Sequence, residues 1–540
     1  MKKIFNWKSG LILIILLAAF LRLWQLGSVP KGISDDEAAY IYNAYSISHT
    51  GKDILGVFLP LSFNAHSSMS PVPVYLIAPF VGTMGLSAFS GRLPAALVSI
   101  GSVFLLFLIT DFLFKNKRIA LISALLLAIS PWALQLGRNV WDVDFAAFFL
   151  LFGIYIFITK IDSKKFLWSL VPFLFAFYSY HATKIYFIFL IPVLIFFFRK
   201  ELLKRKKEMI VFLCGCLLIG ISFLIVLETQ GVTRQTDVFL LKDKNAAILV
   251  NWERQYNSSP WKLRDIFSNK PLYYLRVIRE NYLEAFSTNF LFLYGDVDGG
   301  AQIDNIHFRG VLYVIELPLL LLGIYWLLKN KNGFPKKFLL LLLLIAPLPS
   351  TFTVDRSFVT RDIMMLPVLM IIVACGLAYL LKIIAKQKPI YKYLFISVFV
   401  LFYLFLFSEY VYQYYYRWST YGAEGWQRSY IDLVYLINSE KNNYNQFYIS
   451  GNSQDVLLQY SIFNKVDPNM VQRLWSSKSI KIDNITMFNG CFDSKIFKAL
   501  PKGTFYASLE SDCHYDGATS KKIVDESDPL RTIWNIYENK

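Results

Sequence analysis

Three consecutive carboxylates, Asp35, Asp36 and Glu37, follow Ser34 shortly after the first hydrophobic stretch of the chain. A carboxylate within reach of a hydroxyl group can act as a general base. The same residues also fit the start of a helix, because Ser-x-x-Glu is a capping-box pattern and acids stabilise a first helical turn. The motif alone leaves both interpretations open. A capping box needs one acid, so the extra carboxylates favour a chemical role.

Several cations could serve as partners for these acids or for an anionic substrate. Arg138, Lys184, Arg356 and Arg361 each lie beside a hydrophobic segment. Any one of them alone is explained by a long side chain that reaches from a helix end to the membrane surface. As a set they favour phosphate binding, since arginine offers forked hydrogen bonds to phosphate oxygens.

Histidines and tyrosines near these positions complete the list of candidate site residues. His66 and His307 could contact a phosphate or a metal ion, but no HxxxH spacing is present and a lone histidine is more often structural. The remaining candidates for a substrate pocket are neighbours of the acids and cations in sequence: Tyr40, Tyr75, Tyr180 and His181.

The elements that must position these residues are hydrophobic helices. The chain has 540 residues, of which 55% are hydrophobic, above the range usual for soluble domains. Apolar stretches of membrane-spanning length recur up to residue 408. We expect an all-α polytopic membrane domain over 1–408 with about eleven spans, at roughly 9–26, 92–114, 119–137, 144–159, 166–181, 183–198, 209–227, 309–328, 338–352, 363–381 and 391–408.

The net charge of +17 reflects orientation in a membrane rather than nucleic-acid binding. Lysine and arginine cluster in every alternate loop between the apolar stretches, as the positive-inside rule predicts for cytoplasmic loops. This pattern predicts a multi-pass protein of the plasma (inner) membrane with a cytoplasmic N-terminus and a retained signal anchor at Ser9–Leu26. The outer face then receives loops 27–91 and 228–308.

The polar region 409–540 is expected to form a small extracytoplasmic α/β domain, because it mixes strand-like and helix-like segments. Cys491 and Cys513 lie within it. Outside the cytoplasm they could form a disulfide, and two free thiols are an equal alternative. The short apolar segment 71–80 is rich in proline and suits a helix lying in the membrane interface.

A series of short motifs resembles the GT-C superfamily of lipid-carrier-dependent glycosyltransferases, closest to family 39 with its protein O-mannosyltransferases and aminoarabinose transferases. The pieces occur in order over most of the chain: Asp36-Glu37-Ala38, Thr50-Gly51-Lys52-Asp53, Pro71-Val72-Pro73-Val74-Tyr75, Gly91-Arg92-Leu93-Pro94, Ser130-Pro131-Trp132 with Gly137-Arg138, Tyr178-Ser179-Tyr180-His181, Phe292-Leu293-Tyr294-Gly295-Asp296, and Pro347-Leu348-Pro349-Ser350 with Arg361. The third piece departs from the paired prolines of the family, and Asp35 is an additional acid.

The resemblance implies a sugar donor on a polyprenyl phosphate and an acceptor hydroxyl on a glycan, lipid or protein. It implies Asp36 as the base, with Glu37 as its partner or helix cap. Arg138, Lys184 and Arg361 would then bind the donor phosphate. A divalent metal assists some relatives, and no ligands for one are assigned here. Phosphate is a good leaving group, so one carboxylate and a few cations suffice for a single displacement with inversion.

Two other functions share many of these features. A transporter or flippase of lipid-linked sugars would also have many spans and buried cations, yet no internal inverted repeat is evident. A polymerase of lipid-linked glycans would have a large outer loop carrying arginine. The acidic first loop favours the glycosyltransferase.

Overall fold

The computed structural model describes residues 6–65, 68–230, 239–296, 306, 309–329, 333–354, 358–477, 479–492, 494–513 and 521–539. The chain forms two compact units. The first consists of Met1–Arg22, Ala95–Gly137 and Trp141–Tyr410, and the second of Leu23–Pro94, Arg138–Val140 and Val411–Lys540. The acidic segment and the C-terminal region therefore fold in one unit, although they are far apart in sequence.

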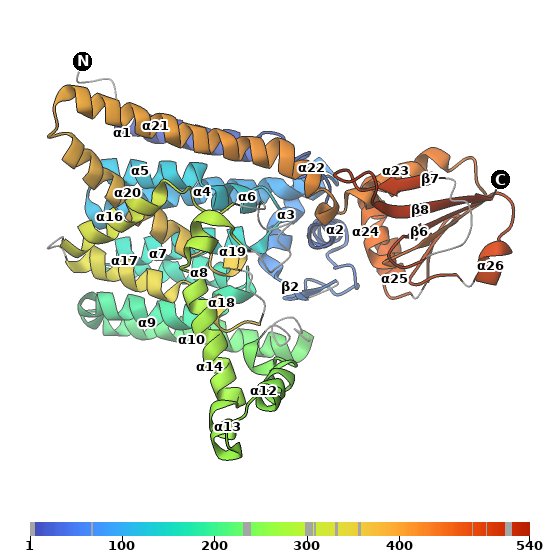
Figure 1. Cartoon of the computed structure of the whole chain (residues 1–540), viewed down its shortest axis with the longest axis horizontal. Coiled ribbons are helices and arrows are strands. Elements are labelled where there is room, and N and C mark those ends of the chain that lie inside the picture. The colour runs from blue at the N-terminus through green and yellow to red at the C-terminus, as the bar shows by residue number, and fades with distance from the viewer. Residues whose placement is uncertain are drawn as a thin grey trace. The chain divides into compact units, whose positions relative to one another are not determined.

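The first unit is a bundle of apolar helices, many of which run side by side (Figure 1). Its elements are α1 (Trp7–Leu23), the part of α4 (Ala88–Phe114) from Ala95 onward, α5 (Lys117–Ile129), α6 (Pro131–Leu136), α7 (Asp142–Lys160), η1 (Lys164–Ser169), α8 (Leu170–Phe177), α9 (His181–Leu203), α10 (Lys206–Gln230), η2 (Leu240–Lys242), α12 (Ala246–Gln255), α13 (Trp261–Phe267), α14 (Lys270–Glu284), η3 (Asn289–Leu293), α16 (Glu316–Lys329), α17 (Gly333–Ile345), α18 (Leu348–Thr351), α19 (Phe358–Arg361), α20 (Met365–Ile384) and α21 (Pro389–Tyr412).

Among the described residues, seven helical segments are long and apolar enough to cross a membrane. They begin at Ala88, Asp142, His181, Lys206, Gly333, Met365 and Pro389. The other four expected spans coincide with α1, α5, α8 and α16, which have 17, 13, 8 and 14 residues. The helical, multi-pass membrane character is thus supported, whereas the count of eleven is not confirmed.

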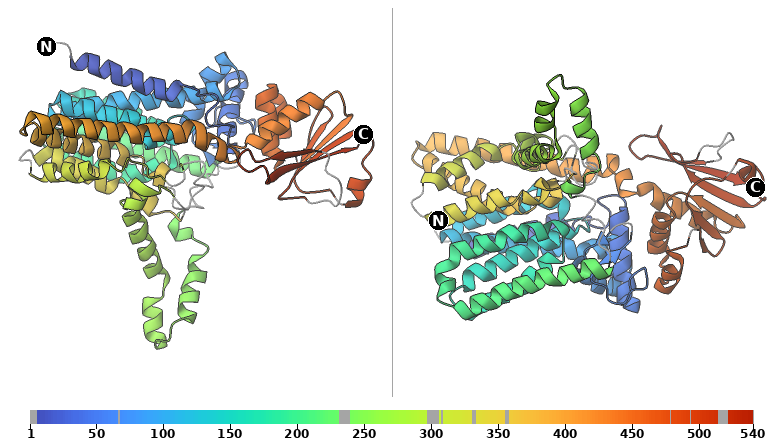
Figure 2. Two further views of the ribbon diagram at one scale, coloured as in Figure 1. Left: turned by 45° about the horizontal axis from the view of Figure 1, so that its top comes forward. Right: turned by 90° about the horizontal axis from the view of Figure 1, so that it is seen from below.

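Burial distinguishes the helices within the bundle. The run Met365–Gly376 of α20 is buried on all sides, as expected for a helix at the centre of a bundle. In α10 and α21 most side chains are exposed although the sequence is apolar. Figures 1 and 2 show α12, α13 and α14 projecting away from the other helices of this unit.

The second unit begins with α2 (Asp35–Thr50), the short strands β1 (Phe63–Asn64) and β2 (Ser68–Met69), and α3 (Pro71–Met84). The predicted interfacial segment 71–80 is therefore helical. Pro71 and Pro73 lie in its first turn, where a missing N–H costs nothing, and Pro79 lies inside the helix. The unit continues with η4 (Gln413–Trp418), α22 (Ser419–Tyr421), η5 (Glu424–Trp426), α23 (Arg428–Glu440), α24 (Ser453–Asn464), α25 (Pro468–Leu474) and α26 (Ser494–Lys498).

The C-terminal part of this unit is built on a mixed sheet in the order β4-β5-β3-β6-β8-β7. The strands are β3 (Gln446–Ser450), β4 (Ser479–Ile482), β5 (Ile485–Phe488), β6 (Thr504–Leu509), β7 (Lys521–Val524) and β8 (Thr532–Asn539). The central strand β3 is parallel to β5 and β6, and the other pairs are antiparallel. Cys491 and Cys513 form a disulfide with an S–S distance of 2.07 Å. The predicted small α/β region at the C-terminus is confirmed.

Candidate active site

The acidic motif forms the N-terminus of α2, as the capping pattern predicts. Ser34 is the N-cap, and its hydroxyl accepts a hydrogen bond from the backbone N–H of Glu37 at 3.2 Å. Asp35, Asp36 and Glu37 occupy the first turn, where the helix dipole favours negative charge. The first half of the capping box is therefore confirmed.

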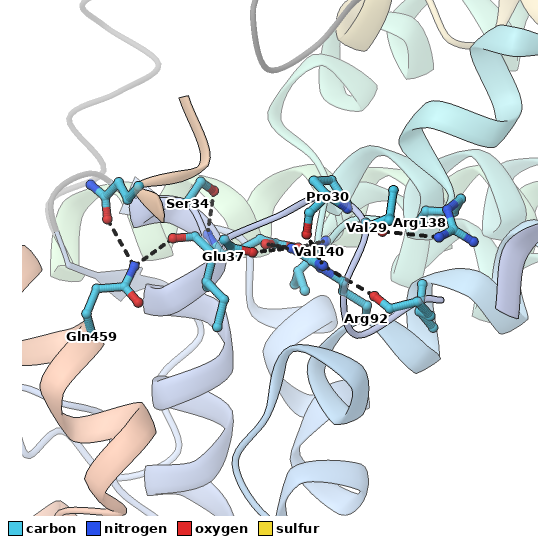
Figure 3. A network of polar contacts seen from close by, with 12 residues as sticks. Val29, Pro30, Ser34, Glu37, Arg92, Arg138, Val140 and Gln459 are labelled. Carbon is cyan, nitrogen blue, oxygen red and sulfur yellow. Dashed lines mark hydrogen bonds and ion pairs between the residues drawn. The ribbon is translucent and has the colours of Figure 1, made fainter. Parts of the chain in front are cut away.

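The second half of the box is replaced by a buried ion pair (Figure 3). The Glu37 carboxylate does not return to the N-cap. It accepts from Arg92 Nε at 2.9 Å and Nη2 at 2.7 Å, and from the Val140 backbone N–H at 2.9 Å. Both side chains of the pair are at most 1% exposed. Glu37 thus joins three segments of the chain, and its part in catalysis stays a prediction.

Arg92, to which the motif pattern gives no role, is the centre of this network. Its remaining N–H groups donate to the backbone carbonyls of Leu26 at 3.2 Å, Pro30 at 3.1 Å and Gly32 at 2.8 Å. The guanidinium therefore uses all five of its donors, two on Glu37 and three on the segment that leads into α2. A buried charge satisfied in this way fixes where α2 begins.

Gly32 is required at its position. Its φ is +108°, and a Cβ there would come within 2.2 Å of the Trp426 carbonyl oxygen. Only glycine adopts this conformation without strain and leaves room for the neighbouring chain. The segment before α2 is therefore held by a tight contact as well as by Arg92.

Residues of the C-terminal region also form hydrogen bonds with the segment before α2. Gln459 of α24 is buried and donates to the Ile33 carbonyl at 2.6 Å, as drawn in Figure 3. Further along α2, the Tyr42 hydroxyl donates to the Val466 carbonyl at 2.7 Å. The C-terminal residues thus help to build the frame around the acidic motif.

Asp36 lies in the first turn of α2, next to the locked Glu37. Its side chain is half-buried, as is that of Asp35. Tyr40, one turn further on, is buried, and its hydroxyl oxygen accepts from the Ser70 N–H at 3.3 Å. Asp36 therefore combines a rigid backbone with partial exposure, which is the arrangement that a general base requires.

Arg138 is also in the second unit and is completely buried. Its guanidinium donates to the Val29 carbonyl at 3.1 Å and lies over the rings of Tyr415 at 4.8 Å and Tyr414 at 5.5 Å. A cation over aromatic rings is stabilised by their π electrons. These contacts hold Arg138 in place, and its role in phosphate binding stays a prediction.

Lys184 lies in the first unit, as the fourth residue of α9. It is half-buried, with its Nζ 4.7 Å from the ring centre of Phe223 and 5.5 Å from that of Phe177. Among the described residues no carboxylate forms an ion pair with it, and Asp142 acts on it from further away. A cation at the positive end of a helix, without an ion-pair partner, suits an anionic ligand.

Arg361 ends the short helix α19 in the first unit and is half-buried. Its neighbour Asp362 is fully buried and accepts from the Ser350 hydroxyl at 2.7 Å. Burial raises the pKa of Asp362 well above its ordinary value, whereas the Ser350 hydrogen bond and the charge of Arg361 oppose that rise. Arg361 therefore sits beside a buried acid that neither the motif pattern nor its spacing indicates.

Three further candidates lie around the helices already described. Tyr75 of α3 donates to the Pro60 carbonyl at 2.8 Å, and burial raises its pKa to about 12. Tyr180 is the N-cap of α9 and His181 is its first residue, so both lie within about one helical turn of Lys184 in the sequence. His66 and His307, and the additional cation Arg356, lie outside the described residues.

The Thr50-Gly51-Lys52-Asp53 piece has a structural explanation. Gly51 ends α2 with φ of +68° and donates to the Ile47 carbonyl. Asp53 is buried, and its Oδ1 accepts from the backbone N–H groups of Leu55 at 2.9 Å and Val57 at 2.8 Å. Burial raises the pKa of Asp53, and these hydrogen bonds counteract the rise. This motif shapes the loop after α2.

No metal centre is visible in the part of the chain that the structure describes. Within it, no three His, Cys, Asp or Glu side chains come together in a way that would hold a metal ion. The structure therefore adds no ligands for the divalent metal that the resemblance allows.

The chain is similar to known proteins in sequence and in fold. Residues 68–227 match the family described as dolichyl-phosphate-mannose-protein mannosyltransferase. Over 220 residues the chain is 27% identical to a protein of Bacillus subtilis (strain 168) named "Putative mannosyltransferase YycA". That alignment spans 40% of this chain but only 31% of the relative's length.

The fold is similar to that of ArnT from Cupriavidus metallidurans, solved with undecaprenyl phosphate bound. The TM-score is 0.52 at 10% sequence identity, and the match covers 98% of each chain. The oligosaccharyltransferase AglB from Archaeoglobus fulgidus matches with a TM-score of 0.46 at 14% identity, over 93% of this chain and 69% of AglB. The chain thus shares the fold of ArnT. The match to the mannosyltransferase family model over residues 68–227 supports the resemblance to lipid-carrier-dependent glycosyltransferases.

Proposed function

We propose that this protein transfers a sugar from a polyprenyl phosphate to a hydroxyl group of an acceptor on the outer face of the plasma membrane, with inversion at the anomeric carbon. The observation that carries the proposal is the frame around Asp36. The buried Glu37–Arg92 pair and the Ser34 cap fix the first turn of α2, while the adjacent Asp36 keeps partial exposure.

In the proposed reaction Asp36 accepts the proton of the acceptor hydroxyl. The acceptor oxygen bonds to the anomeric carbon as the bond between that carbon and the phosphate oxygen breaks. The polyprenyl phosphate departs with the electron pair, and cationic side chains stabilise its negative charge. We assign this stabilisation to Lys184, Arg138 and Arg361.

The orientation follows from the positive-inside pattern. A cytoplasmic N-terminus places α2 and the C-terminal α/β region outside the cytoplasm. The Cys491–Cys513 disulfide supports this side, because disulfides persist in oxidising compartments. The solved ArnT complex with undecaprenyl phosphate supports a lipid-phosphate donor for a chain of this fold.

Replacing Asp36 by asparagine is the decisive test. The Asp36→Asn variant keeps the shape of the side chain but cannot accept the proton. Loss of a general base should reduce sugar transfer by about 10²–10⁴-fold, with the protein still folded. The measurement is release of polyprenyl phosphate from a panel of polyprenyl-phosphate sugars by the purified protein in nanodiscs.

Asp35→Asn is the matched control, because Asp35 has the same charge, lies in the same turn and is also half-buried. Transfer should persist in this variant. Equal activity in wild type and Asp36→Asn would reject Asp36 as the base. Sugar flux across vesicles without any product would indicate a transporter, and a ladder of many added units would indicate a polymerase.

A further inference from the structure

A large open cleft lies within the second unit, beside the network around Glu37. It has a volume of about 730 Å³, within the range of about 300–1,000 Å³ typical of ligand sites. Its walls come from the segment before α2, the start of α4, the outer face of α23, the end of α24 and the residues after β7. Gly32 and Ile33 of the segment that leads into α2 line it, whereas Asp36, Glu37, Arg92 and Arg138 do not.

Helix α23 presents a repeating set of side chains to this cleft. Arg428, Asp432 and Tyr435 follow one another at helical spacing and all line it. The opposite face of α23, including Leu433, Val434 and Ile437, is buried. The helix is therefore anchored by its apolar face, and its polar, aromatic face remains open.

Two ion pairs hold charged groups at fixed positions in the walls. Arg428 binds Asp432 through Nη2–Oδ1 at 2.8 Å and Nε–Oδ2 at 3.3 Å. Lys31 pairs with Glu526 across the cleft lining. All four side chains are about one-third exposed, so each keeps hydrogen-bonding capacity for a ligand.

Aromatic surface lies beside these pairs. Tyr435 is 52% exposed, although it is a large side chain on a helix whose other face is buried. Its ring packs against that of Phe463 at 5.5 Å and 62°. Phe89, at the start of α4, is 38% exposed and lines the same cleft. Rings kept in place and open to solvent offer a flat apolar surface to a ligand.

The combination of ion pairs and exposed aromatic rings in the cleft favours one class of ligand over others. A lipid chain would leave five charged groups without water, namely Lys31, Arg428, Asp432, Lys465 and Glu526, which is costly. A multiply charged phosphate would meet Asp432 and Glu526. A saccharide fits both features, since its hydroxyl groups pair with fixed carboxylates and cations while its C–H faces pack on aromatic rings.

We propose that this cleft binds a saccharide, the acceptor glycan of the transfer reaction. That the saccharide is the acceptor of the reaction rests on the proposed function. Saccharide binding by the cleft does not depend on it. The glycan would be held by Tyr435 and the Arg428–Asp432 pair, next to Gly32 and Ile33 of the segment that leads into α2.

The test uses the full-length protein in nanodiscs on an array of defined oligosaccharides, followed by titration of the best-bound saccharide. Tyr435→Ala and Asp432→Asn should each weaken binding by about tenfold. The matched control is Asp483→Asn, which breaks the surface ion pair with Lys441 elsewhere in the C-terminal region. Circular dichroism establishes that the variants are folded.

Saccharide binding that both cleft variants weaken and Asp483→Asn retains would establish the site. Equal binding by all variants would overturn it, as would an absence of saccharide binding or binding of Ser/Thr peptides instead. Release of polyprenyl phosphate is measured separately. If wild type binds the saccharide but never releases the lipid, the cleft stands and the proposed function fails. If transfer occurs with the acceptor KM unchanged in Tyr435→Ala, the cleft inference fails alone.

Discussion

The N-termini of α2 and α9 both carry candidate site residues, but the charges at the two helix starts have opposite signs and different partners. At α2 an acid lies where the dipole favours it, and Glu37 is neutralised by a buried arginine with every donor satisfied. At α9 a lysine lies where the dipole disfavours it, no side chain caps the helix, and Lys184 has aromatic rings rather than an ion-pair partner around it.

The contrast between Glu37 and Lys184 distinguishes a charge that stabilises the fold from a charge that is available to bind a ligand. A buried charge that is fully paired contributes to a unique structure, and removing one partner is destabilising. A cation without an ion-pair partner, placed against the dipole, lowers stability and is retained where an anion is to be bound. We therefore expect substitutions of Glu37 to change folding first and substitutions of Lys184 to change donor binding first.

The largest effect is expected for Glu37→Gln. The amide removes the negative charge and leaves the Arg92 guanidinium buried without compensation. Breaking a buried pair in this way costs about 3–5 kcal/mol of the free energy of unfolding. The measurement is the denaturation midpoint of the purified protein, compared with Asp35→Asn, which removes an acid from the same turn without breaking the pair.

The double variant Glu37→Leu/Arg92→Met sharpens this result. Removing both charges leaves no uncompensated charge, so part of the lost stability should return. The backbone groups that Arg92 and Glu37 bind in the wild type lose their partners, so the return is incomplete. If the double variant is as unstable as the two single losses added together, the pair is not coupled and the assignment of Glu37 as a positioning residue is wrong.

Lys184→Gln should have a smaller and opposite effect. It removes a cation from the positive end of α9, so stability should rise by about 0.3–1 kcal/mol. The KM for the polyprenyl-phosphate donor should rise by about tenfold, corresponding to about 1.4 kcal/mol of binding. The KM for the acceptor should stay unchanged.

Lys184→Arg serves as the conservative control, because it keeps the charge and should restore most of the donor affinity. A loss of stability in Lys184→Gln with unchanged donor KM would contradict the comparison. In that case Lys184 would be a structural residue held by its aromatic neighbours.

Local sequence patterns were sufficient for the helical membrane character, for the cap at Ser34 and for the helix after Ser70. These features depend on hydrophobic runs and on residues within one turn of each other. The number of spans was less predictable, because α5, α8 and α16 are short helices within longer apolar stretches.

The partners of Glu37 could not be found in this way. Arg92 is 55 residues away and Val140 is 103 residues away in sequence, and Gln459 reaches the segment before α2 from 426 residues away. Such contacts depend on tertiary packing. One available signal was Arg92 itself, a charged residue at the beginning of a long apolar helix, where an unpaired charge would be costly.

The smallest effect concerns the cap of α2. Ser34→Ala removes the acceptor for the Glu37 N–H and should cost about 1 kcal/mol of stability. Because Arg92 and Val140 still hold the Glu37 carboxylate, the start of α2 should stay in place and sugar transfer should change little. The measurement is the denaturation midpoint together with the rate of polyprenyl phosphate release. A large loss of transfer with only a small loss of stability would show that the cap, rather than the buried pair, orients Asp36.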